Sequence, residues 1–324
     1  MMRSMARRAL LAAGAAALAA GSAWAAFPER PVTLVAPYPA GGAADVLARL
    51  LAKRLEDQLG KPVVVDNRPG AGTAIGAAMV ANAKPDGYTL LISSNSTFTM
   101  NPAAGARTSY DPARSFDALG LVGTLPLAVL VNAAVPVKDV QQLVAAAKAQ
   151  PDKFPYGSFG NATSSHYAGA MFTQATGLSL THVPYKGSAP LMTDLIGGQI
   201  PISFDTVVAA APQARTGKIK VLAVTSPQRS STLPDVPTMA ESGYPGFDLT
   251  AWLAMVAPRG LPADVKDRLV KALAAVMISP ETQAAMRKAG FEPQWAPVPD
   301  WTGLVTQDIA RMKAVADKAQ IKLE

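Results

Sequence analysis

The sequence predicts an α/β fold with two lobes, between which the chain crosses twice. Short apolar runs alternate with helical patterns, which indicates parallel strands covered by helices. The alternation stops near residue 97 and starts afresh near residue 138, which indicates a second α/β unit. The C-terminal part is mostly helical and has too few strands for a third unit, so we expect it to return to the first lobe.

The first 25 residues are predicted to be a cleavable signal peptide. A basic start with three arginines precedes an apolar run at residues 9–20, and small residues at 23 and 25 predict cleavage before Ala26. The apolar run is shorter than the roughly 20 residues that span a bilayer. The Arg7-Arg8 pair loosely matches a twin-arginine signal, so export by the Sec or the Tat route stays open.

Composition excludes several classes of function. Without residues 1–25, which hold three arginines and no acid, the formal charge falls from +7 to +4. The sequence has no run of basic residues with interleaved aromatics, so it does not predict nucleic-acid binding. The chain has no cysteine and two histidines, so thiolate metal sites are excluded and we expect no metal and no cofactor.

Five alternating segments predict the first unit. Leu47, Leu51 and Leu55 lie on one side of a helix that Gly60 ends, since glycine readily adopts the left-handed conformation after a helix. Turn signals follow at residues 97–117, and two apolar strands are expected around Pro126. The predicted strands are 32–36, 63–65, 88–92, 119–122 and 127–131, and the helices are 44–59 and 73–83.

The second unit and the C-terminal part follow the same reasoning. Helices are predicted at 138–149, 164–176, 189–197 and 207–216, and strands at 154–157, 180–183, 201–205 and 219–224. After a Ser/Pro-rich stretch at 226–237 we expect a short helix, a strand at 249–256, and helices at 262–278, 280–289 and about 299–318.

A domain division follows from these elements. Residues 26–126 and 249–324 are predicted to form lobe 1 and residues 127–248 lobe 2, with crossings near residues 125–129 and 248–252. Ligands of such folds bind in the cleft, at the carboxyl ends of strands.

The Gly-rich stretch at residues 69–76 resembles a dinucleotide fingerprint but does not match it. Its spacing is G-x-G-x-x-x-G, and Ser93, Ser94 and Asn95 stand where the ribose-binding acid of the next strand would be. We interpret it as a turn that lets a helix pack tightly and exposes backbone N–H groups.

A second turn, at residues 156–166, has a better pattern for a ligand. A strand ends in glycine and asparagine, and Thr163, Ser164 and Ser165 begin a helix whose free N–H groups suit a carboxylate. Ser165 and His166 are adjacent on one helix and point about 100° apart, so they do not form a nucleophile–base pair. We therefore favour binding over hydrolysis.

The sequence leaves open the roles of three further stretches. The turn at residues 37–42 offers Pro, Gly-Gly and Tyr38 with almost no charge. The hydroxyl-rich stretch at 93–97 is either polar lining or a solvated loop. Asp205 ends a strand and either accepts from a ligand amine or hydroxyl or caps the next helix.

Many motifs in register resemble one family, the Bug substrate-binding components of tripartite tricarboxylate transporters. They cover essentially the whole mature chain: Tyr38-Pro39-Ala40-Gly41-Gly42, Asn67-Arg68-Pro69-Gly70-Ala71-Gly72, Asp86-Gly87-Tyr88, Tyr156-Gly157-Ser158, His182-Val183-Pro184-Tyr185-Lys186-Gly187, Asp194-Leu195-Ile196-Gly197-Gly198-Gln199 and Leu233-Pro234-Asp235-Val236-Pro237-Thr238. The chain departs from the family at Ala40, often proline, and at Ala162, often glycine.

The resemblance implies a periplasmic, monomeric "Venus flytrap" of the type II periplasmic-binding-protein kind. Such a protein captures a small organic carboxylate, delivers it to the permease subunits of a tripartite transporter, and is not an enzyme. The alternatives are an exported sensor module for a signalling partner or, with less support, an α/β enzyme acting on a small acid. Carried over, the ligand-binding residues are Tyr38, Gly41, Gly42, Ser94 and Asn95 on one lobe and Ser158, Thr163, Ser164 and Asp205 on the other.

Overall fold

The computed structural model describes residues 27–323. The predicted signal peptide, residues 1–25, therefore lies outside the described residues. Within the described part of the chain, no helix is both long and apolar enough to cross a membrane.

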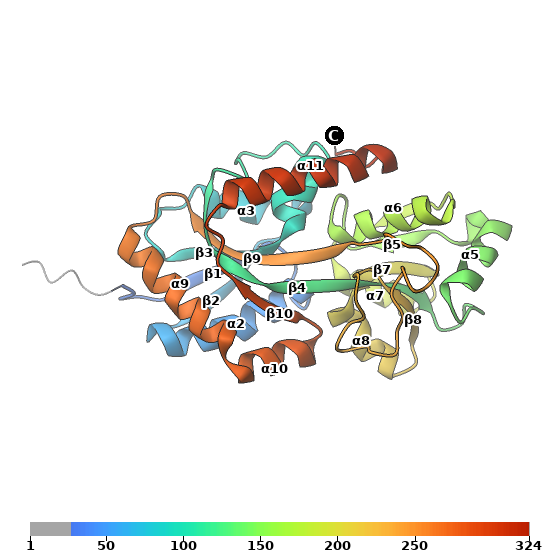
Figure 1. The fold of residues 1–324 in the computed structure, drawn as a ribbon, viewed down its shortest axis with the longest axis horizontal. Coiled ribbons are helices and arrows are strands. Elements are labelled where there is room, and N and C mark those ends of the chain that lie inside the picture. Colours follow the sequence, from blue (N-terminus) through green and yellow to red (C-terminus); the bar gives the residue numbers. More distant parts are fainter. Residues whose placement is uncertain (1–26, 324) are drawn as a thin grey trace, which may run out of the picture.

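The first unit forms as predicted from its local signals (Figure 1). The buried side chains of α2 include Leu47, Leu51 and Leu55, and Gly60 ends this helix with φ 72°. The elements are β1 (Val32–Ala36), α2 (Ala43–Leu59), β2 (Val63–Asn67), η1 (Ala71–Thr73), α3 (Ala74–Ala81) and β3 (Thr89–Ser94). β1 pairs in parallel with β2 and β3.

The stretch after β3 is not a solvated loop. It forms the π-helical turn η2 (Ser96–Met100) and the short helix α4 (Asn101–Ala103), and the side chains from Ser93 to Thr97 are all buried. Two of its hydroxyls, on Thr97 and Thr99, find acceptors on Thr73 and Asp308. Because these partners come from distant segments, the sequence near this polar stretch does not predict its burial.

One strand, β4 (Phe116–Asn132), replaces the two that the sequence predicts around Pro126. Pairing with β9 (Thr250–Pro258) ends at Pro126, and pairing with β7 (Ile202–Thr206) begins at Leu127. A proline cannot donate to a sheet ladder. Pro126 lies where β4 changes its partner from β9 to β7, so the strand continues through it.

The second unit follows its predicted order closely. Its elements are α5 (Val140–Ala149), η3 (Pro151–Lys153), β5 (Tyr156–Ser158), α6 (Ser164–Thr176), β6 (His182–Pro184), α7 (Ser188–Ile196), β7, α8 (Val207–Arg215) and β8 (Ile219–Val224). β5 pairs in parallel with β6 and β7. β4 pairs antiparallel with β7 and β8, so the sheets are mixed rather than wholly parallel.

The C-terminal part returns to the first unit through β9, which pairs antiparallel with β3 and β4. It continues with α9 (Ala263–Ile278), α10 (Pro280–Ala289), β10 (Glu292–Ala296) and α11 (Trp301–Ala319). The sequence prediction missed β10, a short strand that contains Pro293 and pairs with β4 with a shift in register after that proline. The short helix expected after residue 237 is a series of turns instead.

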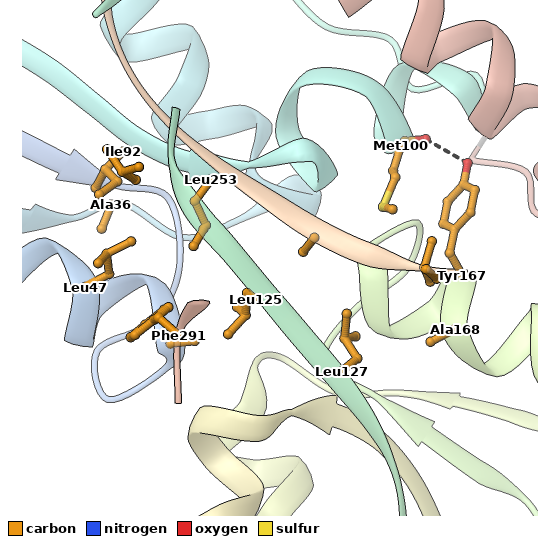
Figure 2. Packing of buried hydrophobic residues seen from close by; sticks show 14 of the residues in the cluster. Ala36, Leu47, Ile92, Met100, Leu125, Leu127, Tyr167, Ala168, Leu253 and Phe291 are labelled. Atoms are coloured by element: carbon orange, nitrogen blue, oxygen red, sulfur yellow. Dashed lines mark hydrogen bonds between the residues drawn. The ribbon is translucent and has the colours of Figure 1, made fainter. Parts of the chain in front are cut away.

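The result is a two-lobed molecule in which β4 and β9 run from one lobe toward the other (Figure 1). The sheet order is β2-β1-β3-β9-β4-β7-β5-β6, with β10 and β8 also on β4. Figure 2 shows buried side chains continuing along β4, from Leu125 to Leu127, and the Tyr167 hydroxyl donating to the Met100 carbonyl oxygen. One hydrophobic core thus contains buried residues of both lobes.

Candidate ligand-binding cleft

Two connected hollows lie where the turns after β1, β3, β5, β6 and β7 meet. The inner cavity measures about 60 Å³ and is lined by Tyr38, Pro39, Ala40, Gly42, Ala43, Ala44, Ser94, Leu125, Phe159, Ser164, Gly187, Ser188, Ala189, Asp205, Thr206 and Leu253. The outer groove measures about 710 Å³, shares Tyr38, Pro39, Phe159 and Gly187 with it, and adds the Gly-rich turn at residues 69–73. Both lie at carboxyl ends of strands, as expected for this architecture.

The first turn of α2 faces the inner cavity through Gly42, Ala43 and Ala44. Gly42 is the N-cap residue, and no side chain caps this helix. The first N–H groups of an α-helix lack acceptors within the helix, and the helix dipole favours an anion beside them. This wall can therefore bind a carboxylate without a cation.

The N–H group of Gly41 makes a hydrogen bond within the protein. It donates to Asp45 Oδ2 at 2.9 Å, and Arg49 also donates to this carboxylate, at 3.1 Å. Burial raises the pKa of Asp45, but the hydrogen bonds from Arg49 and Gly41 outweigh it and leave the pKa lowered. Asp45 is thus an ionised first-turn residue that holds the Gly-Gly turn in shape.

Tyr38 and Ser94 meet on the wall beside α2. The Tyr38 hydroxyl and Ser94 Oγ lie 2.8 Å apart, and both residues line the inner cavity. Asn95, the next residue, is fully buried, and its side-chain amide has no hydrogen-bond partner among the described residues. It does not line the inner cavity.

The hydroxyls at the start of α6 are bonded within the protein. Thr163 Oγ1 donates to the Gly160 carbonyl at 2.7 Å, and Ser165 Oγ donates to the Phe204 carbonyl. The Ser164 N–H donates to Ser96 Oγ, 2.9 Å away on the other lobe. The turn that the sequence favoured as an anion site therefore makes an interlobe contact, and of its three hydroxyl residues only Ser164 lines the inner cavity.

Two stacked histidines, His166 at the end of this turn and His182 on β6, bond to its other residues. The rings of His166 and His182 lie 3.8 Å apart and nearly parallel, and His182 Nε2 is 2.7 Å from Ser158 Oγ. The Ala162 N–H donates to His166 Nδ1 at 3.1 Å. Burial lowers the pKa of His166 to about 3 and that of His182 to about 4, so both rings are neutral at physiological pH.

Ala162, singled out as a departure from the family, has φ 53°. Residues other than glycine seldom adopt this left-handed conformation. Because the Ala162 side chain is fully buried and its N–H is bonded to His166, the surrounding turn holds it there.

Asp205 is one of the residues that line the inner cavity. It is fully buried, and Oδ2 accepts from Ser188 Oγ while Oδ1 accepts from the Thr206 N–H, both at 2.6 Å. Burial raises the pKa of Asp205 to about 6, against these two hydrogen bonds, which lower it. Of the two roles that the sequence left open, the structure shows the bond to the start of α8, and Asp205 is also among the residues that line the inner cavity.

The two lobes touch across the cleft at Pro39 and Gly187. A Cβ atom placed on Gly187 would lie 2.9 Å from Pro39 Cγ, and Gly187 has φ 116° and ψ 173°. Glycine is thus required here both by its conformation and by the space left to it. Together with the contacts of Ser96 with Ser164 and of Met100 with Tyr167, this describes a closed arrangement of the lobes.

The Gly-rich turn at residues 69–76 packs as the sequence analysis expected. A Cβ atom on Gly76 would lie 2.7 Å from the Arg68 carbonyl oxygen and 2.8 Å from Pro37 Cβ, so α3 approaches β1 closely only through glycine. The turn itself lines the outer groove, as does Lys186, an exposed cation.

The structure brings some of the predicted site residues together and leaves others apart. Tyr38, Gly42, Ser94, Ser164 and Asp205 line the inner cavity. Thr163 lines only the outer groove, and Gly41, Asn95 and Ser158 line neither hollow.

Sequence reasoning also missed several lining residues, chief among them Ser188, Gly187 and Phe159. The repeated strand–turn–helix pattern at residues 184–189 was the signal that could have found the first two. Within residues 27–323, no cluster of three or more metal-ligating side chains forms.

Comparison with known proteins gives consistent matches over nearly the whole chain. Residues 47–321 match the model of the tripartite tricarboxylate transporter family receptor. Protein BugT of Bordetella pertussis (strain Tohama I / ATCC BAA-589 / NCTC 13251) is 34% identical over 300 residues, which cover 92% of this chain and 92% of BugT.

Solved structures agree in fold. The structure of periplasmic binding protein BugD has a TM-score of 0.87 and 38% identity, and the match covers 92% of this chain and 100% of that one. The structure of R. palustris Rpa4515 with adipate has a TM-score of 0.88 and 35% identity, over 91% of this chain and 99% of that one.

Proposed function

The chain belongs to the tripartite tricarboxylate transporter receptor family, and on that premise we propose that it captures a small organic carboxylate between its lobes and delivers it to a membrane permease. The family consists of transporter receptors, which bind a solute and do not transform it. Proteins of this kind act in the periplasm.

The uncapped first turn of α2 in the wall of the inner cavity is the observation that carries the proposal. Backbone N–H groups of this turn line the same cavity as Tyr38 and Ser94, which carry hydroxyls. None of the described residues that line this cavity is Lys, Arg or His. Neutral donors hold a carboxylate through charge-assisted hydrogen bonds without the desolvation cost of a buried ion pair. Such a site also releases its anion readily, which suits handover.

We further propose that residues 26–126 and 249–324 form lobe 1 and residues 127–248 form lobe 2. The change of strand partners on β4 between Pro126 and Leu127 supports this division. Residues 1–25 are proposed as a signal peptide removed before Ala26. Mass spectrometry of the exported protein tests it, since a mature N-terminus elsewhere contradicts it.

A screen of carboxylates by thermal shift tests the binding function. A ligand at 100 times its Kd stabilises the folded state by about 2.7 kcal/mol, so mono-, di- and aromatic acids that bind raise the melting temperature. If no carboxylate does so, the proposal fails. Gel filtration in the same buffers tests the expectation of a monomer.

Ala43→Pro tests the role of α2 directly. Ala43 is the first helical residue, where proline is tolerated, and Gly42 before it has the extended ψ of 170° that a following proline needs. The substitution deletes one N–H at the cavity, so affinity for a carboxylate is expected to fall about tenfold or more.

Ala263→Pro is the matched control, because Ala263 is exposed and begins α9, outside both hollows. Equal affinities of the two variants for the carboxylate would show that the first turn of α2 does not bind it. Co-purification with permease subunits, as against a signalling protein, decides between delivery for transport and a sensor role.

A further inference from the structure

Asp205 is a buried carboxylate that its own protein contacts do not saturate. An ionised carboxylate offers about four lone-pair positions to donors. Two are filled, by Ser188 Oγ on one oxygen and by the Thr206 N–H on the other. The remaining acceptor positions belong to a residue that is fully buried and lines the inner cavity.

The surroundings of Asp205 stabilise its negative charge but supply no opposite charge. Thr206 begins α8 and Ser188 begins α7, so two helix N-termini stabilise the carboxylate. No lysine, arginine or histidine is among the described residues that line the cavity with it. Burial raises the pKa of Asp205 to about 6, so the carboxyl group is mostly ionised at pH 7.5.

Two parts of the lining of the inner cavity thus differ in chemistry. The first turn of α2 presents N–H donors, and Asp205 presents a negative acceptor. A second ionised carboxylate beside Asp205 would face like charge at low dielectric, with no cation to offset it. A hydroxyl or ammonium group there would make a charge-assisted hydrogen bond instead.

From this asymmetry we infer that the ligand is a carboxylate that carries a hydrogen-bond donor, a hydroxyl or an ammonium group, and presents that donor to Asp205. The inference rests on the proposed function, because it assumes that a carboxylate binds at the first turn of α2. It makes Asp205 the residue that determines specificity within the class of small organic acids.

Two sets of acids, matched in length, test the inference by calorimetry at pH 7.5. The four-carbon set is butanoate, succinate, 4-hydroxybutanoate and 4-aminobutanoate. The six-carbon set is hexanoate, adipate, 6-hydroxyhexanoate and 6-aminohexanoate. In a set that binds, the wild-type protein is expected to prefer a donor-bearing acid over the diacid and the parent acid by about tenfold or more, the range for a hydrogen bond to a charged group.

Asp205→Asn removes the charge and keeps the shape, so the preference over the diacid is expected to fall to about threefold or less, since a lost charged hydrogen bond carries most of it. Asp117→Asn is the matched control. Asp117 is also a buried carboxylate, held by the Gly260 and Leu261 N–H groups outside the cavity, and its loss leaves the preference unchanged.

Any of three results overturns the inference. It fails if the diacid or parent acid binds the wild-type protein as tightly as the donor-bearing acids do, or if Asp205→Asn keeps the wild-type preference. It also fails if neither set binds while other carboxylates do. If Asp205→Asn does not fold, the wild-type ranking decides alone. Failure of every carboxylate in the wider screen refutes the proposed function as well, which separates the two claims.

Discussion

Gly187→Ala tests whether the approach of the two lobes at Pro39 belongs to the ligand-bound state. With φ 116° and ψ 173°, Gly187 occupies a backbone region that is essentially restricted to glycine. An alanine there costs about 1–3 kcal/mol whether the cleft is open or closed. At roughly 2–4 °C per kcal/mol for a chain near this size, the melting temperature without ligand falls by several degrees.

The contact with Pro39 adds a second cost, which applies only when the lobes are closed. The new Cβ atom would lie 2.9 Å from Pro39 Cγ, closer than side chains pack. Forcing one extra methyl group into a tight contact costs about 1–3 kcal/mol. If binding requires closure, affinity therefore falls by about 5- to 150-fold.

Calorimetry with the best acid from the screen measures the affinity, and Gly177→Ala is the matched control. Gly177 also has a positive φ, 66°, at the end of α6, but a Cβ atom there meets nothing within 4 Å. This variant is expected to melt earlier and to bind normally. If Gly187→Ala also binds normally, the closed contact at Pro39 is not part of the bound state and the reasoning is refuted.

Three further variants or conditions test the cleft and its support. Tyr38→Phe removes the hydroxyl 2.8 Å from Ser94 Oγ and is expected to weaken binding by about 1 kcal/mol, or fivefold, in calorimetry; unchanged affinity would show that the hydroxyl does not organise the site. Thr163→Ala is expected to lower the free energy of unfolding by about 1 kcal/mol and to leave affinity within about twofold, because its hydroxyl bonds a backbone carbonyl in its own turn; a tenfold loss of affinity would return it to the binding site. Because burial lowers the pKa values of His166 and His182 to about 3 and 4, the unfolded chain binds more protons, and stability falls as the pH drops from about 6.5 toward 4, by up to about 1.4 kcal/mol per pH unit for each ring. Urea unfolding at several pH values, compared with a variant that has glutamine at both positions, isolates this share, and equal pH slopes would contradict it.

Much of the fold was predictable because its signals are local. The spacing of Leu47, Leu51 and Leu55 and the glycine at position 60 bound α2 without reference to any other segment. The same holds for α6 and β8, whose observed limits are those predicted. The single strand through Pro126 was not predictable, because it depends on β9 and β7 meeting β4 at that point.

The site divides in the same way. Strand–turn–helix junctions with Gly, Ser and Thr indicated the cleft walls, and the residues carried over from the family resemblance include Tyr38 and Ser94, whose hydroxyls lie 2.8 Å apart. The sequence could not show that the hydroxyls of Thr163 and Ser165 are bonded within the protein, because their acceptors depend on how each turn closes and which strand lies beneath it.

The sequence by itself therefore determined most of the elements, their order and the chemistry of the turns, since helix periodicity, capping and glycine conformation act over a few residues. Only the tertiary structure decided which groups face the cavity. It left the first turn of α2 uncapped in one wall and set a buried, unsaturated Asp205 in another. A hydrogen-bonding group is free for a ligand only if no neighbour in space takes it, and those neighbours are far apart in the chain.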